Sequence, residues 1–572
     1  MQAVILAAGK SRRFYPLAEG THKSMIKLLG KPIIEYTING LVSSGIKEII
    51  IVENNKGFIS SYFGDGKRLN ADIKYAVQEE PSGGGDGLLC AAPFVKDDFI
   101  FLNGSHADAE NFIQKLINAK GDNKGVVLAR EKEGTTNSGV LKVEKNKLID
   151  LVEKPNKGEE PSKLCVIGIY LFSKTFLEEL KNTPREHYSL EKAISSFAKK
   201  NPVWVVKTDI ESVTLKYPWD LLGFKDFILK SVKTKVSKLA DIAKSAQISR
   251  EVIVEDGATI MEGAKIKGPC YIGKNAYIGT NSILRSGVDV GEKCVIGANM
   301  EFKNSIIMAG SKTHSGFIGD SIISQNCRVA AQFCTANVRL DRETVKVLID
   351  DKKVDTGLRS LGMITGKNVH IGVKSSTMPG ILIGHNVVVG PSTTVVRNIE
   401  ENTTYYSKFQ EIVATKKKKV VLFDIDYTLF DTKNFKDSNL KDHSLYNEVI
   451  GVLEKVSKVA DLGIFSEGEV AFQKNKLVKT DIKKYFDKKH THIVEKKDLS
   501  LEKILRKYEK DFLILVDDKL GVLHSAKNMM PSVFTVWVKR GMYAQLQKPI
   551  ENFSPNETLD NLGELASIVS KV

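Results

Sequence analysis

The sequence is poor in cysteine and aromatic residues and has no long apolar run. Its six cysteines include no C-x-x-C pair, which argues against a zinc or dithiol redox motif and favours reduced thiols in the cytoplasm. Aromatic residues form 8% of the chain and do not alternate with basic residues, as a surface that stacks nucleic-acid bases would require. No basic segment precedes the first apolar run, and no stretch is long enough to cross a bilayer. We therefore expect a cytoplasmic protein with neither membrane nor nucleic-acid partners.

What the sequence has in excess is positive charge. The 84 Lys and Arg residues outnumber the 69 Asp and Glu residues, which gives a net charge of +15. The basic residues are dispersed, and 416–419 is their only long block. A dispersed excess suits anionic small molecules such as sugar phosphates and nucleotides better than nucleic acid. At 572 residues, the chain should contain about three or four domains.

Residues 1 to about 232 alternate strand and helix patterns, as expected for a doubly wound α/β sheet. The apolar run at 3–8, closed by Gly9, is typical of a strand buried on both faces. A polar, basic loop at 9–13 follows, and loops of this kind bind phosphates through backbone N–H groups. A second buried strand is expected at 48–52.

Short motifs follow in a fixed order: P-L at 16–17, H-K-S-M at 22–25, G-K-P at 30–32, Q-E-E-P at 78–81, G-V at 139–140 and E-K-P at 153–155. This order resembles the sugar-1-phosphate nucleotidylyltransferases and implies a Rossmann-like domain over 1–232. By this resemblance, Arg13 and Lys23 hold the nucleoside triphosphate, UTP or dTTP. It also places Gly9, Gln78 and Gly83 on the nucleotide side, and Gly139, Glu153 and Lys154 on the sugar-phosphate side.

Two positions depart from that family's pattern. The reaction brings negative charges together, and the family holds Mg²⁺ with two carboxylates to offset them. Here Ser105 stands at the first carboxylate position and Thr214 at the second. A shifted register that uses Asp108 or Asp209 instead is the alternative. We expect the phosphate-binding residues to be retained and nucleotidylyl transfer to be absent or very slow.

The middle of the chain, residues 233–412, contains a repeat of six residues. Apolar residues stand at unbroken intervals of six: Ile248, Val254, Ile260, Ile266, Ile272, Ile278, Leu284, Val290, Ile296 and Phe302. A second series follows at Ile371, Thr377, Ile383, Val389 and Val395. This period is typical of a parallel β-helix, in which each coil buries its neighbour. The hexapeptide type resembles the left-handed β-helix acyltransferases, which form trimers and bind acyl-CoA between subunits.

The segments between the two series carry polar motifs around 301–305, 310–314 and 319–321. With the first domain, they resemble the bifunctional N-acetylglucosamine-1-phosphate uridylyltransferases/glucosamine-1-phosphate acetyltransferases. The resemblance implies that His314 is the general base of acetyl transfer from acetyl-CoA. It also implies that Arg285 and Lys303 hold the sugar phosphate and that Asn337 contacts the amine. Gln332 and Phe317 replace a glycine and a tyrosine of the pattern, so sugar binding is better preserved than acyl-CoA binding.

Residues 416–572 begin a new α/β pattern. An apolar strand at 420–423 ends in the D-x-D-x-T motif 424–428, a second strand ends at Ser466, and a third ends at Asp517-Asp518. Acidic residues at the ends of parallel strands can hold Mg²⁺. These motifs resemble the haloacid dehalogenase superfamily of phosphatases. Only about 37 residues separate Thr428 from Ser466, which leaves little room for a cap domain.

The resemblance implies a role for each acidic residue of this last domain. Asp424 is the nucleophile that forms an aspartyl-phosphate, and Asp426 is the general acid and base. Asp424, Asp426 and Asp517 hold Mg²⁺, with Asp518 in support. Ser466 and Lys497 stabilise the phosphoryl oxygens, and Lys496 or Lys503 are alternatives to Lys497.

Two functional hypotheses follow from these three domains. The first is a multifunctional enzyme that acts on amino-sugar phosphates or nucleotide sugars. The second is a trimeric scaffold that binds sugar nucleotides and in which only the phosphatase is active. Ser105 and Thr214 favour the second hypothesis. The sugar, the base and the acyl group are left open by the sequence.

Overall fold

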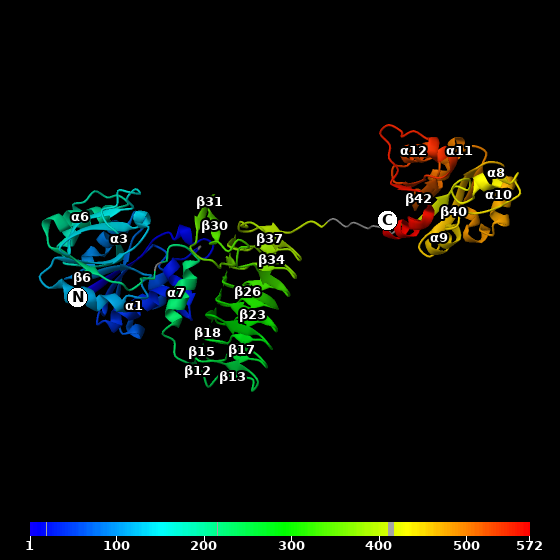
Figure 1. Cartoon of the computed structure of the whole chain (residues 1–572). Coiled ribbons are helices and arrows are strands. Elements are labelled where there is room, and N and C mark those ends of the chain that lie inside the picture. Colours follow the sequence, from blue (N-terminus) through cyan, green and yellow to red (C-terminus); the bar gives the residue numbers. More distant parts are fainter. Residues whose placement is uncertain (19, 214, 410–416) are drawn as a thin grey trace. The chain divides into compact units, whose positions relative to one another are not determined.

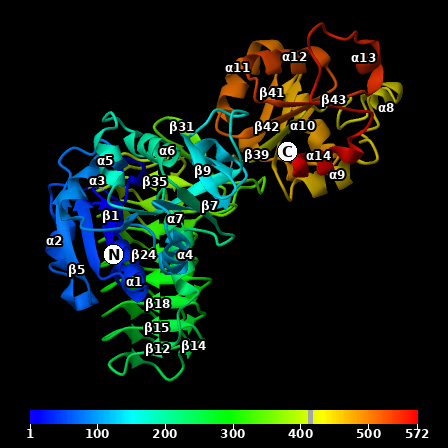
Figure 2. The same ribbon diagram turned by 90° about the vertical axis from the view of Figure 1, so that its left-hand side faces the viewer.

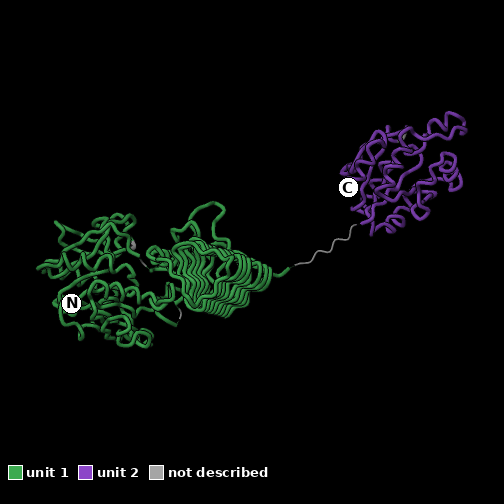
Figure 3. Tube along the Cα trace, turned by 90° about the horizontal axis from the view of Figure 1, so that it is seen from below, with its two compact units in different colours: residues 1–409 green, residues 410–572 purple. Residues whose placement is uncertain are grey.

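The computed structural model describes residues 1–18, 20–213, 215–409 and 417–572. Thr214, one of the two positions where a carboxylate was expected, lies outside the described residues. The chain forms two compact units, residues 1–409 and residues 410–572 (Figures 1 and 3). In the described part of the chain, no helix is long and apolar enough to cross a membrane.

The first part of unit 1 is an α/β layer around a nine-stranded sheet of order β5-β4-β1-β6-β10-β7-β11-β9-β8. Its strands are β1 (Gln2–Ala7), β4 (Glu48–Glu53), β5 (Asp72–Val77), β6 (Phe99–Asn103), β7 (Gly125–Glu131), β8 (Gly139–Glu144), β9 (Lys147–Glu153), β10 (Leu164–Phe172) and β11 (Val203–Lys207). Its helices are α1 (Ile33–Ser43), α2 (Phe58–Phe63), α3 (Gly84–Ala91), α4 (Glu110–Lys120), α5 (Phe176–Lys181) and α6 (Ser189–Lys200). The strands expected at 3–8 and 48–52 are confirmed as β1 and β4.

Strand β1 is buried on both faces, as its continuous apolar run predicted. Val4 belongs to the apolar cluster that includes residues of α3, α5 and α6. Ile5 belongs to the cluster on the other face, which includes residues of α1 and α4. Strand β1 pairs in parallel with both β4 and β6. The loops after β1 and β6 therefore leave the same edge of the sheet, where ligands of α/β folds bind.

The second part of unit 1 is a parallel β-helix of three sheets, which confirms the prediction from the six-residue period. Ile260 pairs with Ile278, and Ile278 pairs with Ile296, so that each coil takes three hexapeptides. Figure 2 shows strands β12, β15, β18 and β24 of one sheet above one another. The repeated apolar residues point inward and form one continuous cluster.

The first sheet comprises β12 (Lys235–Val236), β15 (Val252–Val254), β18 (Cys270–Ile272), β21 (Val288–Val290), β24 (Ile306–Ile307), β27 (Ile322–Ile323), β32 (Met363–Thr365) and β35 (Ile381–Ile383). The second comprises β13 (Asp241–Ile242), β16 (Thr259–Ile260), β19 (Tyr277–Ile278), β22 (Val295–Ile296), β25 (Lys312–Thr313), β28 (Arg328–Val329), β33 (His370–Ile371), β36 (Val388–Val389) and β38 (Thr404–Tyr405). The third comprises β14 (Gln247–Ile248), β17 (Lys265–Ile266), β20 (Ile283–Arg285), β23 (Met300–Lys303), β26 (Gly316–Gly319), β29 (Phe333–Thr335), β34 (Ser376–Thr377) and β37 (Thr394–Val395). A hairpin, β30 (Lys346–Ile349) and β31 (Lys352–Asp355), interrupts the coils.

Helix α7 (Asp220–Leu229) joins the two parts of unit 1. The helix ends at Leu229, and the coils begin at β12. Apolar residues of α7 pack in one cluster with Leu28 of the α/β part and Ile306 of the coils. The buried Lys225 of α7 donates hydrogen bonds to the Gly287 carbonyl (2.7 Å) and to Asn304 Oδ1 (3.0 Å), and it contacts Asp226.

Replacing Lys225 by Met should destabilise unit 1 by roughly 2–4 kcal/mol, because the buried acceptors of Gly287 and Asn304 would lose their charged donor. Denaturant unfolding followed by circular dichroism measures the change in free energy of unfolding. The matched control is Lys230→Met, since Lys230 follows the same helix and is exposed. Equal stabilities of the two variants would show that the buried ammonium group contributes nothing to holding the two parts together.

Unit 2 is built on a six-stranded parallel sheet of order β41-β40-β39-β42-β43-β44. Its strands are β39 (Lys419–Phe423), β40 (Asp461–Glu467), β41 (Thr491–Val494), β42 (Phe512–Asp517), β43 (Phe534–Val538) and β44 (Glu557–Leu559). Its helices are α8 (Thr432–Asp437), α9 (Val449–Val456), α10 (Val470–Lys479), α11 (Lys497–Leu505), α12 (Leu520–Met529), α13 (Gly541–Leu546) and α14 (Leu565–Lys571). Strand order reverses at β39, between β40 and β42, and such a switch point places a crevice at the carboxyl ends of the strands.

Candidate functional sites

A cleft of about 930 Å³ lies where the loops after β1, β5, β6 and β9 meet. It gathers most of the residues that the sequence placed at the nucleotide and the sugar phosphate: Gly9, Arg13, Lys23, Gln78, Gly83, Glu153 and Lys154. Gly139 does not line the cleft. It supports the cleft instead, because a Cβ atom at this position would come within 2.8 Å of Glu153 Oε2.

The cleft is strongly cationic. Its basic lining residues are Lys10, Arg12, Arg13, Lys23, Lys132, Lys154 and Lys216, and its carboxylates are Glu153 and Glu191. Burial, with the neighbouring Arg13, lowers the pKa of Lys23 to about 8. Burial also lowers the pKa of Lys216, again with Arg13 nearby. Closely spaced cations with depressed pKa values bind an anion that relieves their repulsion, and a polyphosphate is such an anion.

Lys23 is positioned by its local structure. It begins the short 3₁₀ helix η2 (Lys23–Met25), and its main-chain N–H donates to Ser11 Oγ (3.1 Å). Its Nζ donates to the Leu215 carbonyl. Ser11 occurs at φ 51°, a left-handed conformation that is uncommon outside glycine. The hydroxyl thus ties the phosphate loop to the segment that carries Lys23.

Neither of the two acids that a shifted register would use, Asp108 and Asp209, lines the cleft. Ser105 lines it. Asp108 lies outside it, where it accepts hydrogen bonds from Ser212 Oγ (2.6 Å) and Val213 N (3.0 Å) beside His106. Asp209 is exposed and also lies outside the cleft. In the described part of the chain, the one group of three or more potential metal ligands lies in unit 2.

The β-helix carries a polar network on adjacent coils. The buried Asp320 accepts hydrogen bonds from Lys303 (3.0 Å), Asn304 (2.8 Å) and Asn337. Arg285 lies opposite Lys303 on the preceding coil and binds Glu301 at 2.7 Å. Lys303, Asn304 and Asp320 line a cavity of about 390 Å³.

His314 does not join this network. It is exposed, follows β25 at a corner of the coil, and does not line the cavity of Lys303 and Asp320. Within one chain, the structure therefore brings together three of the four residues expected on the sugar side and leaves the expected base apart from them.

Unit 2 has a cluster of buried carboxylates at the carboxyl ends of its central strands. Asp424, Asp517 and Asp518 each place one oxygen within 4.8 Å of the others. Lys497 Nζ lies 2.5 Å from Asp424 Oδ1 and 2.5 Å from Asp517 Oδ2. The two alternatives to Lys497, Lys496 and Lys503, are exposed.

The electrostatics of this cluster fit a divalent cation. Burial raises the pKa of Asp424 to about 6, against the effect of Lys497. Burial and the other two carboxylates raise the pKa of Asp518 to about 8. The buried oxygen Asp518 Oδ2 has no hydrogen-bond partner among the described residues. Three repelling carboxylates, one with an unsatisfied oxygen, are the hard ligands that Mg²⁺ prefers.

The side chain of Asp426 stands outside the carboxylate cluster of Asp424, Asp517 and Asp518. Its carboxylate accepts hydrogen bonds from Thr432 (2.7 Å), Gln473 (2.6 Å) and Lys476 (2.6 Å). Despite burial, the contact with Lys476 gives Asp426 a pKa below its usual range.

Sequence analysis missed Gln473 and Lys476. Both lie on α10, one helical turn apart, so they share the face directed at Asp426. The buried Lys476 also lies against the rings of Phe430 and Phe472, at 5.1 and 4.9 Å from their centroids. The sequence feature that could have indicated them is a Gln and a Lys at positions i and i+3 of the helix after Ser466. The same spacing occurs on many solvent-facing helices, so by itself it does not identify a functional pair.

Ser466 lies near the carboxyl end of β40, the strand that pairs with β39. It is buried in β40, and among the described residues its Oγ has no hydrogen-bond partner. A cavity of about 450 Å³ opens beside Asp424 and Asp426 and is walled by Phe435, Phe472 and Lys476. No cap domain separates this cavity from the surface, because α8, α9 and their loops account for the described chain between β39 and β40.

Comparisons with known proteins concern unit 1. The family model described as Nucleotidyl transferase matches residues 2–212, the GMPPB C-terminal domain matches residues 266–376, and the Hexapeptide repeat of succinyl-transferase matches residues 363–391. The Bifunctional protein GlmU of Methanococcus aeolicus is 36% identical over 424 residues, which cover 73% of this chain and 100% of that relative. The protein of the same name from Methanocaldococcus jannaschii is 35% identical over 426 residues, with the same shares covered.

A third relative, the Bifunctional sugar-1-phosphate nucleotidylyltransferase/acetyltransferase of Sulfurisphaera tokodaii, is 31% identical over 404 residues, or 70% of this chain and 98% of the relative. These relatives are covered almost completely and leave more than a quarter of this chain outside the alignment. In this chain, the match to the nucleotidyl transferase model precedes the match to the hexapeptide repeat, which is the order of the sheet and the coils in unit 1. The chain therefore belongs to the family of the bifunctional GlmU proteins, the sugar-phosphate nucleotidyltransferase/acetyltransferases.

Proposed function

We propose that unit 2 is a Mg²⁺-dependent phosphatase of the haloacid dehalogenase type, fused to a family member whose nucleotidyltransferase cleft binds substrates but transfers nucleotidyl groups slowly. The observation that supports this most is the convergence of Asp424, Lys497, Asp517 and Asp518, with the unsatisfied hydroxyl of Ser466 nearby. Phosphoryl transfer needs little beyond such positioning and charge compensation.

The first step is attack by Asp424 on phosphorus. With a pKa of about 6, Asp424 is mostly ionised at neutral pH. One of its oxygens forms a bond to phosphorus while the bond from phosphorus to the leaving oxygen breaks, which gives an aspartyl-phosphate. Lys497 and Ser466 donate hydrogen bonds to the phosphoryl oxygens. When bound, Mg²⁺ supplies positive charge between the carboxylates and the phosphoryl group.

The second step is hydrolysis of the aspartyl-phosphate. Asp426 removes a proton from water, whose oxygen attacks phosphorus and restores the Asp424 carboxylate. Lys476 and Gln473 keep Asp426 ionised, which is the form that this step needs. In the first step, the protonated minority form of Asp426 gives its proton to the leaving oxygen, and removal of a proton from water in the second step restores that form. Assays for phosphate, pyrophosphate and thiol release on one preparation test the proposal, and we expect phosphate release with Mg²⁺ to be the fast activity.

For unit 1, we propose that the cleft binds UTP or dTTP together with a sugar 1-phosphate. The support is the set of seven basic residues that line it. The alternative, a fully active multifunctional enzyme, is favoured by the retained Arg13, Lys23 and Lys154. Against it, Ser105 and Thr214 stand where the family has its two carboxylate ligands for the metal. Acetyl transfer from acetyl-CoA, with His314 as base, is a second activity that the family relationship favours.

We further propose that the coils are left-handed and that unit 1 assembles as a homotrimer. His314 and the Lys303 network lie apart in one chain, and a neighbouring chain can complete such a site under cyclic symmetry. Light scattering at micromolar concentration should give a mass near three times 63.3 kDa. A monomeric mass would contradict the assembly and would remove the support for acetyl transfer.

A further inference from the structure

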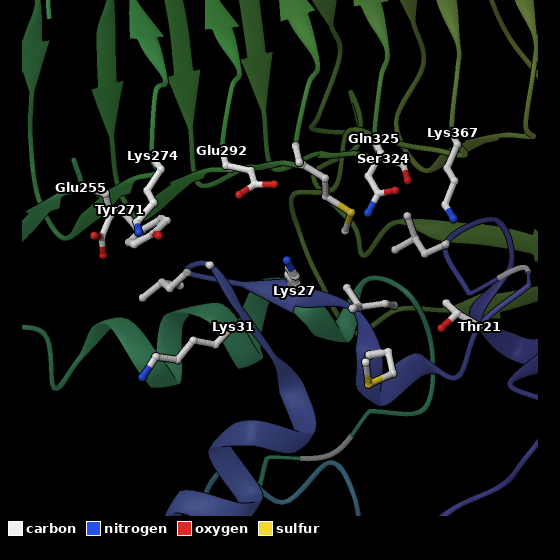
Figure 4. Close-up of a pocket in the computed structure, with 18 residues that line it drawn as sticks. Thr21, Lys27, Lys31, Glu255, Tyr271, Lys274, Glu292, Ser324, Gln325 and Lys367 are labelled. Atoms are coloured by element: carbon white, nitrogen blue, oxygen red, sulfur yellow. The ribbon is translucent and has the colours of Figure 1, made fainter. Parts of the chain in front are cut away.

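A second cavity, of about 350 Å³, lies inside unit 1 between the coils and the short hairpin of β2 (Lys27–Leu28) and β3 (Lys31–Pro32) (Figure 4). It shares no lining residue with the nucleotide cleft. Gly30 fits the hairpin closely onto the coils, because a Cβ atom there would lie 2.4 Å from Tyr271 Oη. Its φ of +77° also disfavours other residues.

The coil side of this cavity is a row of polar side chains from successive turns. Glu255 follows β15, Lys274 follows β18, Glu292 follows β21, Gln325 follows β27 and Lys367 follows β32. The charged side chains of this row make no hydrogen bond and no ion pair with any described residue. Figure 4 shows them directed toward the hairpin, with Lys27 facing them from below. Lys274 and Glu292 are exposed, and Glu255 and Lys367 are partly buried, so a ligand from solvent can reach all four.

The two ends of the row differ in charge. Glu255 and Glu292 lie at one end together with Tyr271, and Lys274 lies between the two glutamates on the intervening coil. Lys367 lies at the other end with Ser324 and Gln325, and no carboxylate lines the cavity there. Successive coils are ~4.8 Å apart. Glu292 and Lys367 lie three coils apart, so their main-chain positions are separated by roughly 14 Å along the axis of the β-helix. Met308 and Leu29 add an apolar wall between the ends.

We infer that this cavity is a binding site for a hydroxylated phosphomonoester, such as a sugar phosphate or a nucleoside monophosphate. The phosphate would bind Lys367 and the donors of Ser324 and Gln325. The hydroxyl or amino groups would donate to Glu255 and Glu292, since carboxylates accept hydrogen bonds from such groups, and a hydroxyl oxygen would accept from Lys274. The apolar face of the sugar or base would lie on Met308.

The site is coupled to the nucleotide cleft by a shared segment. Residues 21–25 present His22 and Lys23 to the cleft, while Thr21 and Met25 line the second cavity. A ligand that binds the second cavity and orders this segment also fixes the position of Lys23 in the nucleotide cleft. The ligand of the cavity and the nucleotide must then change each other's affinity by the same factor. This coupling rests on the proposed nucleotide binding, whereas binding to the cavity itself does not.

Hydrogen exchange read by mass spectrometry on the full chain tests the site. The protein carries Asp424→Asn and is studied without Mg²⁺, so that unit 2 does not consume the probe. The probes are N-acetylglucosamine 1-phosphate, UMP and inorganic phosphate. We expect the sugar phosphate or UMP to protect residues 21–31, and we expect the variant Lys274→Gln with Lys367→Gln to lose at least tenfold in the affinity that this protection reports. Lys265→Gln, an exposed lysine on the third sheet, should bind normally.

Three results would overturn the inference: no protection of residues 21–31 by either organic probe, protection that does not depend on Lys274 and Lys367, or equal protection by inorganic phosphate alone. The second result would assign the protection to the nucleotide cleft. A protein without phosphatase or nucleotidylyltransferase activity could still show the expected protection. Failure of the proposed function can therefore be distinguished from failure of the second binding site. Coupling between the second cavity and the nucleotide cleft is measured by the affinity for UTP. A saturating concentration of the sugar phosphate or UMP should change that affinity at least fivefold.

Discussion

Replacing Asp424 with Asn should lower phosphate release from phosphomonoesters by a factor on the order of 10³ or more, as loss of a covalent nucleophile does. An amide is nearly isosteric with the carboxylate but does not attack phosphorus. The fold should be retained, because Asp424 repels Asp517 and Asp518 and the substitution removes one of these charges. Initial rates with Mg²⁺ and a panel of sugar phosphates measure the effect.

Three controls sharpen this result. Asp498→Asn, an exposed acid beside Lys497, should leave the rate unchanged. Asp426→Asn should cost more with alkyl phosphates than with aryl phosphates, since a poor leaving group depends more on its proton donor. Chelation of Mg²⁺ should stop turnover reversibly. If Asp424→Asn hydrolyses phosphomonoesters as fast as the unaltered protein, unit 2 is not a phosphatase of this type.

Placing carboxylates at the two sequence positions where the family has them should raise the rate of nucleotidylyl transfer. The variant Ser105→Asp with Thr214→Asp is expected to raise pyrophosphate release roughly 10²-fold or more. The reason is that a bound metal contributes several kcal/mol of charge stabilisation in the transition state and that each 1.36 kcal/mol changes the rate tenfold. The assay uses Mg²⁺, N-acetylglucosamine 1-phosphate and either UTP or dTTP.

The matched control for this prediction is Ser138→Asp, which places a carboxylate elsewhere in the same cleft and should not raise the rate. Nucleotide binding without metal should weaken in Arg13→Ala and in Lys23→Ala, because both cations line the cleft. Ordinary turnover by the unaltered protein would refute the idea that Ser105 marks a lost metal site.

The sequence predicted the elements that are set by local patterns. The strand at 3–8, the coils with their period of six and the three strands that end in Asp424, Ser466 and Asp517 are all present. Each depends on residues that are close together in the sequence or repeat at a fixed interval. The gathering of Arg13, Lys23 and Lys154 in one cleft also followed from the order of motifs, because parallel strands end at a common edge.

The features that were missed depend on contacts between distant residues. Lys476 reaches Asp426 from 50 positions away, and Lys225 reaches Asn304 from 79 positions away. Neither lysine differs in its local pattern from a solvated surface lysine. The side chain of Asp426 is likewise held by contacts from a distant element, since Gln473 and Lys476 of α10 both donate hydrogen bonds to it.

The central claim is that unit 2 turns over phosphomonoesters while unit 1 binds a nucleotide without transferring it at a comparable rate. One measurement compares phosphate release and pyrophosphate release per active site in the same purified full-length protein, with Mg²⁺, UTP and N-acetylglucosamine 1-phosphate. Phosphate release that is faster by at least ~10² and that disappears in Asp424→Asn is the predicted result. Fast pyrophosphate release, or phosphate release that survives Asp424→Asn, would contradict it.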